Sequence, residues 1–533
     1  MLRNFFKTAL RNIIKYRAYS LINFVGLTSG LALSLLIITY VRSELSYDRF
    51  HTKADRIYRL RYTAPNGMEL ATTPPPIAPR LKEFFPEVED AGRMYGRNVS
   101  ISRPDDSEVF EETDVFFADP AIMNILSFEF VKGTPEGALN DEFTVLITEE
   151  MATKYFGERN PVGQTLRFSN AHAFTVTGVV KNFPINSHIR FNMLVPYENM
   201  YDLETDQAAT AMRHNFEINY VISHSYTYVM LKPGADPASV NSKMGDFIKK
   251  YAQPSLQVGQ VFALMPLVDI HLNSTLLAEP SPTNSMSNLI IFAGIGMLTL
   301  LIASINYINL STAQSLTRIK EIGIRKIMGS MRYQLISQFL AESFLFCLIA
   351  LLLSFAIFHS LLPMLNEVTG KNLQFNEVVD SFLMFSSLIL LVIITLLAGG
   401  YPAYFVTRFN SVHALKGDRL PLGGSQFMRK VLVVFQLTIA CMLLTGSLII
   451  MKQIDFLDNR PLGFKKDQVI TVPLFSQNVN GIFRQDDSTY RNRLQSFRNM
   501  IEAQSGVRKT TLSSTPPGLG AMFRGTVPEG FTE

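Results

Sequence analysis

The chain has 533 residues, which is long enough for several domains, and a formal net charge of +4. Its two cysteines, Cys347 and Cys441, both lie within apolar segments, so no disulfide framework is indicated. The basic residues gather beside apolar segments. This distribution favours membrane topology and anionic lipid, and it argues against nucleic acid as a partner.

Five segments are long and apolar enough to cross a bilayer, since each has roughly 20 residues without charge. These predicted spans cover residues 20–41, 287–310, 343–362, 381–401 and 431–451. The first is too long for the apolar region of a signal peptide, and no small-residue cleavage site follows it. We therefore interpret it as a retained anchor.

Several residues within the spans indicate how the helices pack. Gly26 and Gly30 have the spacing that allows a close helix contact, and Asn306 should face another helix because an unpaired amide is costly in hydrocarbon. Pro402 lacks a backbone donor and should end or kink the fourth span. The middle of each span has no acid or base, which argues against an ion-driven secondary transporter.

The short segments between spans predict the orientation. Residues 1–19 form a predicted amphipathic helix at the cytoplasmic membrane surface, and its basic residues recur every fourth position at Arg3, Lys7, Arg11 and Lys15. A positive-inside signal alone is the alternative reading of this segment. Basic residues also mark the segments 311–342 and 402–430. We therefore expect a multi-pass protein of the cell (inner) membrane with a cytoplasmic N-terminus.

This orientation places residues 42–286 outside the cytoplasm, and this region is long enough for a folded α+β domain. Thr148 is a predicted N-cap of a helix that ends at Gly157, and a second helix is predicted over 237–251. Strands are predicted at 144–147, 174–180 and 224–231. Residues 452–533 are the predicted start of a second external domain. We expect the chain to be truncated there, because it does not return to the membrane.

The segment between the second and third spans predicts a short charged helix. Leu316, Ile319, Ile322 and Ile327 keep close to helical spacing on one face, and Arg318, Glu321 and Arg325 lie on another. Gly329 stands where this helix would end, and Ser330 can cap the next one. A solvated cytoplasmic turn and a knob that docks on a partner are both consistent with this pattern.

Four stretches resemble FtsX/MacB-type ABC transporter permeases. The pattern R-x-K-E-I-G-I-R-K-x-x-G-S from Arg318 resembles the family's coupling region, and E-L-S-Y-D-R-F-H from Glu44 resembles the entry to its MacB-like periplasmic core domain. N-S-H at 186–188 and N-S-V-H-A-L-K-G at 410–417 also resemble family segments. The resemblance implies an α-helical membrane protein with a large extracytoplasmic α+β domain. It also implies a cytosolic ABC ATPase partner, with a second permease copy and a periplasmic adaptor as further partners.

The resemblance assigns ATPase docking to the charged helix. The residues it implies there are Arg318, Glu321, Gly323, Arg325, Lys326 and Gly329. Glu321 and Arg325 have the spacing of a helical ion pair, Arg325 and Lys326 would meet acidic groups, and Gly323 would allow close approach.

The motifs that are missing also bound the function. The sequence has no G-x-x-x-x-G-K-[ST] phosphate loop and no common metal-site signature, so we expect no catalytic residues, no metal and no cofactor in this chain. The resemblance implies a non-catalytic permease subunit that moves its external domains mechanically for export or efflux of a peptide, drug or lipoprotein type of substrate. The alternative is a membrane-anchored extracytoplasmic sensor that signals through a partner protein.

Overall fold

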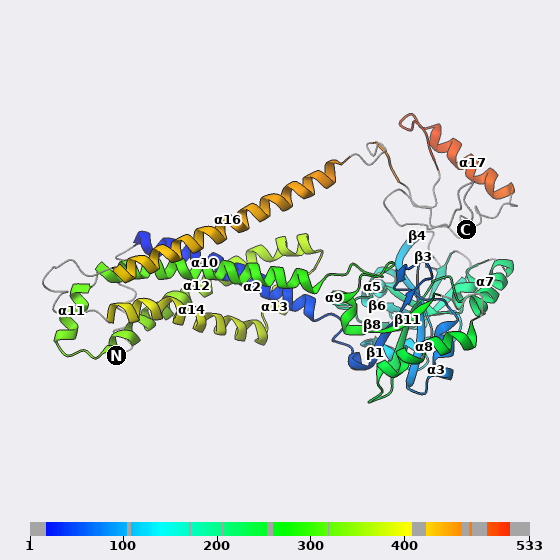
Figure 1. The fold of residues 1–533 in the computed structure, drawn as a ribbon. Coiled ribbons are helices and arrows are strands. Elements are labelled where there is room, and N and C mark those ends of the chain that lie inside the picture. Colours follow the sequence, from blue (N-terminus) through cyan, green and yellow to red (C-terminus); the bar gives the residue numbers. More distant parts are fainter. Residues whose placement is uncertain are drawn as a thin grey trace, which may run out of the picture.

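The protein is elongated, with a bundle of long helices at one end and an α+β domain at the other (Figure 1). The computed structural model describes residues 17–103, 108–169, 172–204, 206–252, 259–317, 319–407, 423–460, 468–471 and 488–511. The predicted basic helix, with Arg3, Lys7, Arg11 and Lys15, lies outside these residues. Of the predicted second external domain, the helix α17 (Ser488–Glu502) is described.

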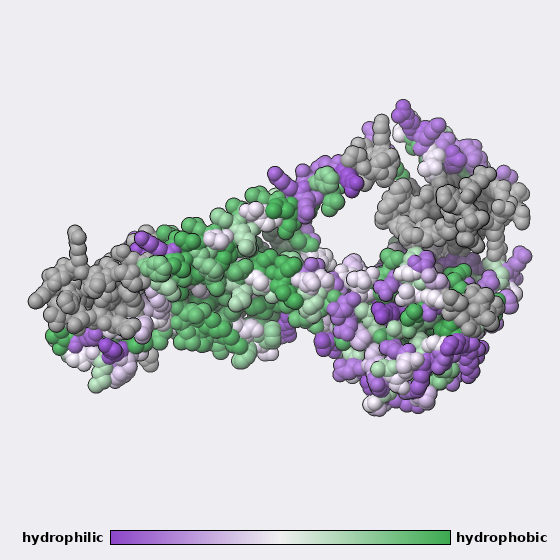
Figure 2. Space-filling view, in the orientation of Figure 1, coloured by the Kyte–Doolittle hydropathy of each residue, from purple (hydrophilic) through white to green (hydrophobic). Residues whose placement is uncertain are grey.

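Five helices in the described residues are long and apolar enough to cross a membrane. They are α2 (Arg17–Leu45), α10 (Met286–Thr317), α12 (Arg332–Thr369), α14 (Ser381–Thr407) and α16 (Gly423–Asn459). Each contains one of the five predicted spans. Their surface is predominantly hydrophobic, in contrast to the mixed surface of the α+β domain (Figure 2).

Helices α2, α10, α12 and α14 share one apolar core, which includes Leu31, Ala303, Cys347 and Ala398. A Cβ atom added at Gly30 would lie only 2.8 Å from Ala303 Cβ, so the glycine is what permits this approach of α2 and α10. At Gly26 the same construction gives 3.3 Å to the amide nitrogen of Asn306. The predicted close contact at the two glycines is confirmed, and Asn306 faces another helix as expected.

The α+β domain is inserted between α2 and α10 and is built on one mixed sheet. The strand order is β11-β1-β10-β3-β4-β9-β6-β8-β5, with β2 beside β1 and β7 beside β3 and β8. Pairs β4–β9 and β6–β8 are parallel, and the others are antiparallel. The strands are β1 (Ile57–Thr63), β2 (Glu69–Leu70), β3 (Val88–Ser102), β4 (Val109–Ala118), β5 (Phe130–Lys132), β6 (Thr144–Thr148), β7 (Thr165–Phe168), β8 (His172–Val180), β9 (Met193–Pro196), β10 (Tyr226–Leu231) and β11 (Val261–Pro266).

Three apolar cores pack against this sheet. One includes Leu60 of β1, a second includes Val145 of β6, and a third includes Met230 of β10. The long strand β3 contributes side chains to all three cores. The helices are α3 (Ile77–Phe84), α4 (Ile122–Ile125), α5 (Glu149–Phe156), α6 (Asn199–Asp202), α7 (Asp206–Ile218), α8 (Pro237–Tyr251) and α9 (Ile270–Asn273).

Local sequence signals fix several of these elements. The Thr148 hydroxyl accepts from the Met151 amide at the start of α5, and Gly157 follows its last residue, as predicted. Helix α8 has the predicted bounds. By contrast, α14 does not end at Pro402 but continues to Thr407.

Candidate coupling site

The short helix α11 (Ile319–Ile327) connects α10 to α12 at the end of the bundle remote from the α+β domain (Figure 1). It ends in a Schellman motif. The amide of Ser330 donates to the carbonyl of Arg325 (3.0 Å), the amide of Gly329 donates to that of Lys326 (3.3 Å), and Gly329 has a φ of +96°. Because Ser330 completes this motif, the N-cap of α12 is Met331. The prediction that Ser330 caps α12 is therefore wrong.

The polar side chains of α11 hold it against the bundle. Arg325 Nη1 donates to Gln338 Oε1 of α12 at 3.0 Å, and Lys326 Nζ donates to the Thr407 carbonyl at the end of α14 at 3.2 Å. Ile322 is buried against Leu335, Phe339 and Ala403. Helix α11 is thus fixed to both α12 and α14.

The predicted docking residues therefore divide into distinct groups. Arg325 and Lys326 make contacts within the chain, Gly323 is buried, and Gly329 is exposed at the turn. The burial of Gly323 argues against the prediction that it lies at the surface a partner approaches. Arg318 and the side chain of Glu321 lie outside the described residues, so the predicted Glu321–Arg325 pair stays a prediction.

Five apolar side chains are exposed in this region, alongside the exposed Arg332. Met328 is 82% exposed and Ile327 58% exposed, and Ile324, Met331 and Tyr333 are exposed beside them. We call these five residues the α11 apolar face. The predicted apolar face placed Ile327 with Ile322, but in the structure Ile322 is buried and Ile327 is exposed. The adjacent pair Ile327–Met328 at the helix end was the signal that could have indicated an exposed apolar patch.

At the opposite end of the bundle, α2 meets the turn between the third and fourth helices. Arg42 forms a bidentate ion pair with Asp380, with both Nη–Oδ distances at 2.6 Å. The hydrogen bond from Arg42 lowers the pKa of the Asp380 carboxyl to about 2. Asp380 also accepts from the Leu383 amide (3.0 Å) in the first turn of α14. This contact joins α2 to the start of α14.

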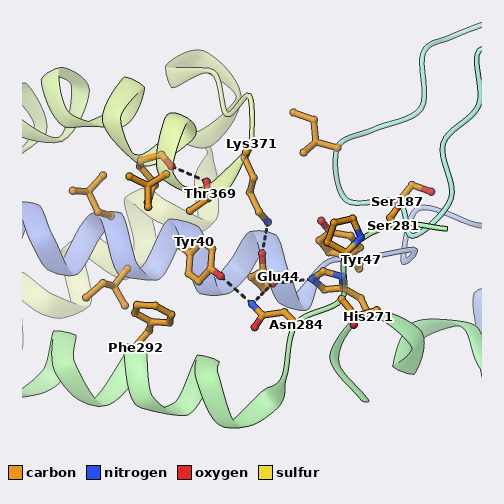
Figure 3. A pocket seen from close by; sticks show the side chains of 18 of the residues that line it. Tyr40, Glu44, Tyr47, Ser187, His271, Ser281, Asn284, Phe292, Thr369 and Lys371 are labelled. Carbon is orange, nitrogen blue, oxygen red and sulfur yellow. Dashed lines mark hydrogen bonds and ion pairs between the residues drawn. The ribbon is translucent and has the colours of Figure 1, made fainter. Parts of the chain in front are cut away.

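Two residues further along α2, Glu44 is 3% exposed and is contacted by residues from three other segments (Figure 3). Its carboxylate lies 2.6 Å from Lys371 Nζ and accepts from His271 Nε2 (2.8 Å) and Asn284 Nδ2 (2.7 Å). Burial lowers the pKa of the Lys371 ammonium, and Glu44 opposes that shift. We call Glu44, His271, Asn284 and Lys371 the junction cluster. It joins α2 to the α+β domain, to the start of α10 and to the loop after α12.

The chain leaving α2 is fastened to the domain core at Asp48, which is fully buried and has a left-handed φ of 58°. Its amide donates to the Asn186 carbonyl (2.8 Å), and its carboxylate accepts from the His188 amide (3.1 Å) and lies 2.9 Å from His188 Nδ1. The other ring nitrogen of His188 is hydrogen-bonded to Tyr228 of β10 (2.7 Å). Burial acts to raise the pKa of Asp48, but His188 holds it below its ordinary value.

Two of the stretches that resemble family segments thus form one contact. Asp48 belongs to the E-L-S-Y-D-R-F-H stretch, and His188 belongs to N-S-H. Among the described residues, no group of three or more His, Cys, Asp or Glu side chains could hold a metal ion. The junction cluster and the Asp48–His188 contact connect α2 to the α+β domain.

These features define a class: a multi-pass helical membrane protein with an α+β domain inserted between its first two membrane helices. Residues 20–247 match the family of MacB-like periplasmic core domains, and residues 293–411 match the family of FtsX-like permease C-terminal domains. The chain is thus an ABC transporter permease of the FtsX/MacB type. The predicted family and fold class are confirmed, and the α+β domain is extracytoplasmic.

The chain is similar to named relatives and to solved structures. The macrolide export ATP-binding/permease protein MacB of Bdellovibrio bacteriovorus is 29% identical over 280 residues, which cover 51% of this chain but only 38% of that relative. The ABC transporter permease YknZ of Bacillus subtilis is 22% identical over 77% of this chain and 98% of its own length. A permease domain from Porphyromonas gingivalis aligns with a TM-score of 0.35 and 24% identity, over 45% of this chain and 99% of that structure.

Proposed function

We propose that this chain is the membrane subunit of an ABC transporter and that a separate cytosolic ATPase docks on the α11 apolar face. The single observation that carries the docking assignment is the outward exposure of Ile327 and Met328 on a short helix fixed to α12 and α14. Exposed contiguous apolar groups are typical of protein interaction sites. The basic residues flanking the bundle at this end support its cytoplasmic placement and a cytoplasmic N-terminus.

In this proposal the roles of the predicted docking residues are distinct. Arg325 and Lys326 position α11 on the bundle, and the α11 apolar face contacts the ATPase. A force on α11 then reaches α12 and α14 directly, because hydrogen bonds to Gln338 and to the Thr407 carbonyl join α11 to both helices.

The opposite end of the bundle passes movement to the extracytoplasmic domain. The junction cluster and the Asp48–His188 contact fasten α2 to that domain through buried polar contacts. ATP hydrolysis in the partner would thus move the external domain mechanically, for export or efflux of a peptide, drug or lipoprotein type of substrate. A second permease copy and a periplasmic adaptor would complete the assembly.

The test is a pull-down of the full-length tagged chain from its own cells in mild detergent, with mass spectrometry of the proteins that accompany it. We expect an ATPase with a phosphate loop. The double variant Ile327→Asp/Met328→Asp should lose it, since a carboxylate cannot be buried in an apolar interface without a partner. The matched control is Ile222→Asp, which changes an exposed isoleucine of the α+β domain.

Two further variants separate positioning from contact. Glu321→Lys/Arg325→Glu should also weaken ATPase recovery, because Arg325 would lose its bond to Gln338. Recovery of the same amount of ATPase with Ile327→Asp/Met328→Asp and with the control would refute docking on this face. Recovery of a kinase in place of an ATPase would favour the sensor function.

A further inference from the structure

A cavity of about 700 Å³ opens beside the junction cluster, between α2, α10, the end of α12 and the loop 181–192 of the α+β domain (Figure 3). One half of its lining is apolar and comes from the membrane helices: Leu36, Ile37, Phe292, Ile295, Leu365 and Val368. The other half is polar and comes from the junction cluster and from Arg190. The division between the halves coincides with the ends of the spans, where hydrocarbon gives way to lipid headgroups.

The apolar half is accessible from the membrane. Val368 is 76% exposed and Phe292 43% exposed, although both line the cavity. An acyl chain could therefore enter sideways between α10 and α12, without passing through water. A soluble polar ligand would instead have to desolvate against this apolar wall, which is unfavourable.

The polar half carries one positive charge that the protein does not neutralise. Lys371 is matched by Glu44 at 2.6 Å, and Glu44 is further satisfied by His271 and Asn284. Arg190 lines the same end and is exposed, and within the described part of the chain its guanidinium has no hydrogen bond or ion pair. A guanidinium presents a planar set of donors that suits phosphate or carboxylate groups.

We propose that this cavity binds an anionic membrane amphiphile, with an acyl chain in the apolar half and a phosphate headgroup at Arg190. The occupant to which we commit is an anionic phospholipid of the outer leaflet. The site lies at the opposite end of the bundle from α11, so this proposal does not depend on ATPase docking.

The test uses the full chain in nanodiscs that contain phosphatidylglycerol or phosphatidylcholine with a photoreactive group on the acyl chain. Cross-linked peptides are identified by mass spectrometry. We expect labelling of the segments 286–297 and 361–371, and stronger labelling by phosphatidylglycerol. Arg190→Ala should reduce phosphatidylglycerol labelling there by about tenfold, because it removes a charged hydrogen bond, and should leave phosphatidylcholine labelling unchanged.

Two controls make the outcome specific. Arg61→Ala removes an exposed arginine of the α+β domain and should leave labelling unaltered. Ile37→Trp fills the apolar half and should reduce labelling by both lipids. If this variant does not fold, the Arg190→Ala variant alone tests whether the cavity binds the lipid. Lysophosphatidylglycerol should reduce labelling by the phosphatidylglycerol probe. Glycerol phosphate, which lacks the acyl chain, should leave this labelling unchanged.

Three results would overturn the proposal. They are the same labelling by both lipids, unchanged labelling by phosphatidylglycerol in Arg190→Ala, and labelling spread evenly over the outer surface of the bundle. Effective competition by glycerol phosphate would instead assign the site to a free phosphate compound, and the bilayer lipid would be ruled out as its occupant.

Discussion

The ammonium nitrogen of Lys371, in the loop after the third membrane helix, lies 2.6 Å from the carboxylate of Glu44, in the last turn of the first. Both side chains are buried, 5% and 3% exposed. Two opposite charges withdrawn from water are stable only while both are present. This pair therefore links α2 to the loop after α12 only as long as neither charge is lost.

We expect Glu44→Gln and Lys371→Met each to destabilise the protein by on the order of 3 kcal/mol, because each leaves an unmatched buried charge. The double variant should be markedly more stable than the sum of the two single losses predicts. Thermal unfolding of the full chain in detergent measures this. Additive losses would show that the two side chains act independently.

The Arg42–Asp380 pair should behave differently, since its side chains are 43% and 32% exposed. Solvent screening limits such a pair to about 1 kcal/mol or less. Asp380→Asn keeps a side-chain oxygen for the Leu383 amide and should have a small effect, whereas Asp380→Ala also removes the helix cap and should cost about 1 kcal/mol more. The same unfolding measurement compares the two variants, and indistinguishable values would argue against the capping role.

Stability should fall on acidification, in part through His51. Burial lowers the pKa of this imidazole to about 4, against the opposing effect of Asp48. Between pH 6.5 and 4 the unfolded chain binds a proton that the folded chain does not, so this residue makes stability decrease as the pH falls through that window. The loss ceases below about pH 4, where both states are protonated.

The variant His51→Gln should remove one proton from that dependence, about 1.4 kcal/mol per pH unit, and keep an acceptor for the Ser127 amide. His224, whose pKa burial lowers to about 3, contributes in the same direction, so the remaining slope should not vanish. Unfolding at a series of pH values, compared with His224→Gln, measures both contributions. An unchanged slope in His51→Gln would contradict the assignment.

Gly30→Ala should destabilise the bundle by about 1–3 kcal/mol, because the new methyl group would lie 2.8 Å from Ala303 Cβ and force α2 and α10 apart. The matched control is Gly294→Ala in α10, where an added Cβ meets no atom within 4 Å. That variant should be neutral or slightly stabilising, since alanine is the better helix former. Equal losses in the two variants would refute the packing argument.

Much of the architecture could be predicted from local sequence. The apolar segments, the Thr148 cap and the glycine pair are signals carried by neighbouring residues, and each has its expected counterpart in the structure. The orientation of α11 could not be predicted this way. Helical spacing placed Ile322 and Arg325 on different faces, but in the structure both contact the bundle, because α12 and α14 offer apolar contacts to Ile322 and polar contacts to Arg325 and Lys326.

The junction cluster was not predicted, because its four members come from separate segments of the chain. The stretch that Glu44 opens indicated the family but gave no contact partner for its carboxylate, and Lys371 has the pattern of an ordinary loop residue. Only the approach of α2, α9 and the ends of α10 and α12 brings them together. Arg190 was not predicted either, because nothing in its local sequence indicates that it lies beside the membrane helices.

Helix α2 runs without a break from Arg17 to Leu45, a length of about 43 Å, and the buried Asp48 follows after only two intervening residues. The membrane anchor and the domain are therefore joined without a flexible linker. Their relative rotation is set by the number of residues in the helix. Each added residue would turn everything beyond it by about 100°. The number of residues in α2 therefore has to suit the orientation of the domain relative to the bundle as well as the thickness of the bilayer.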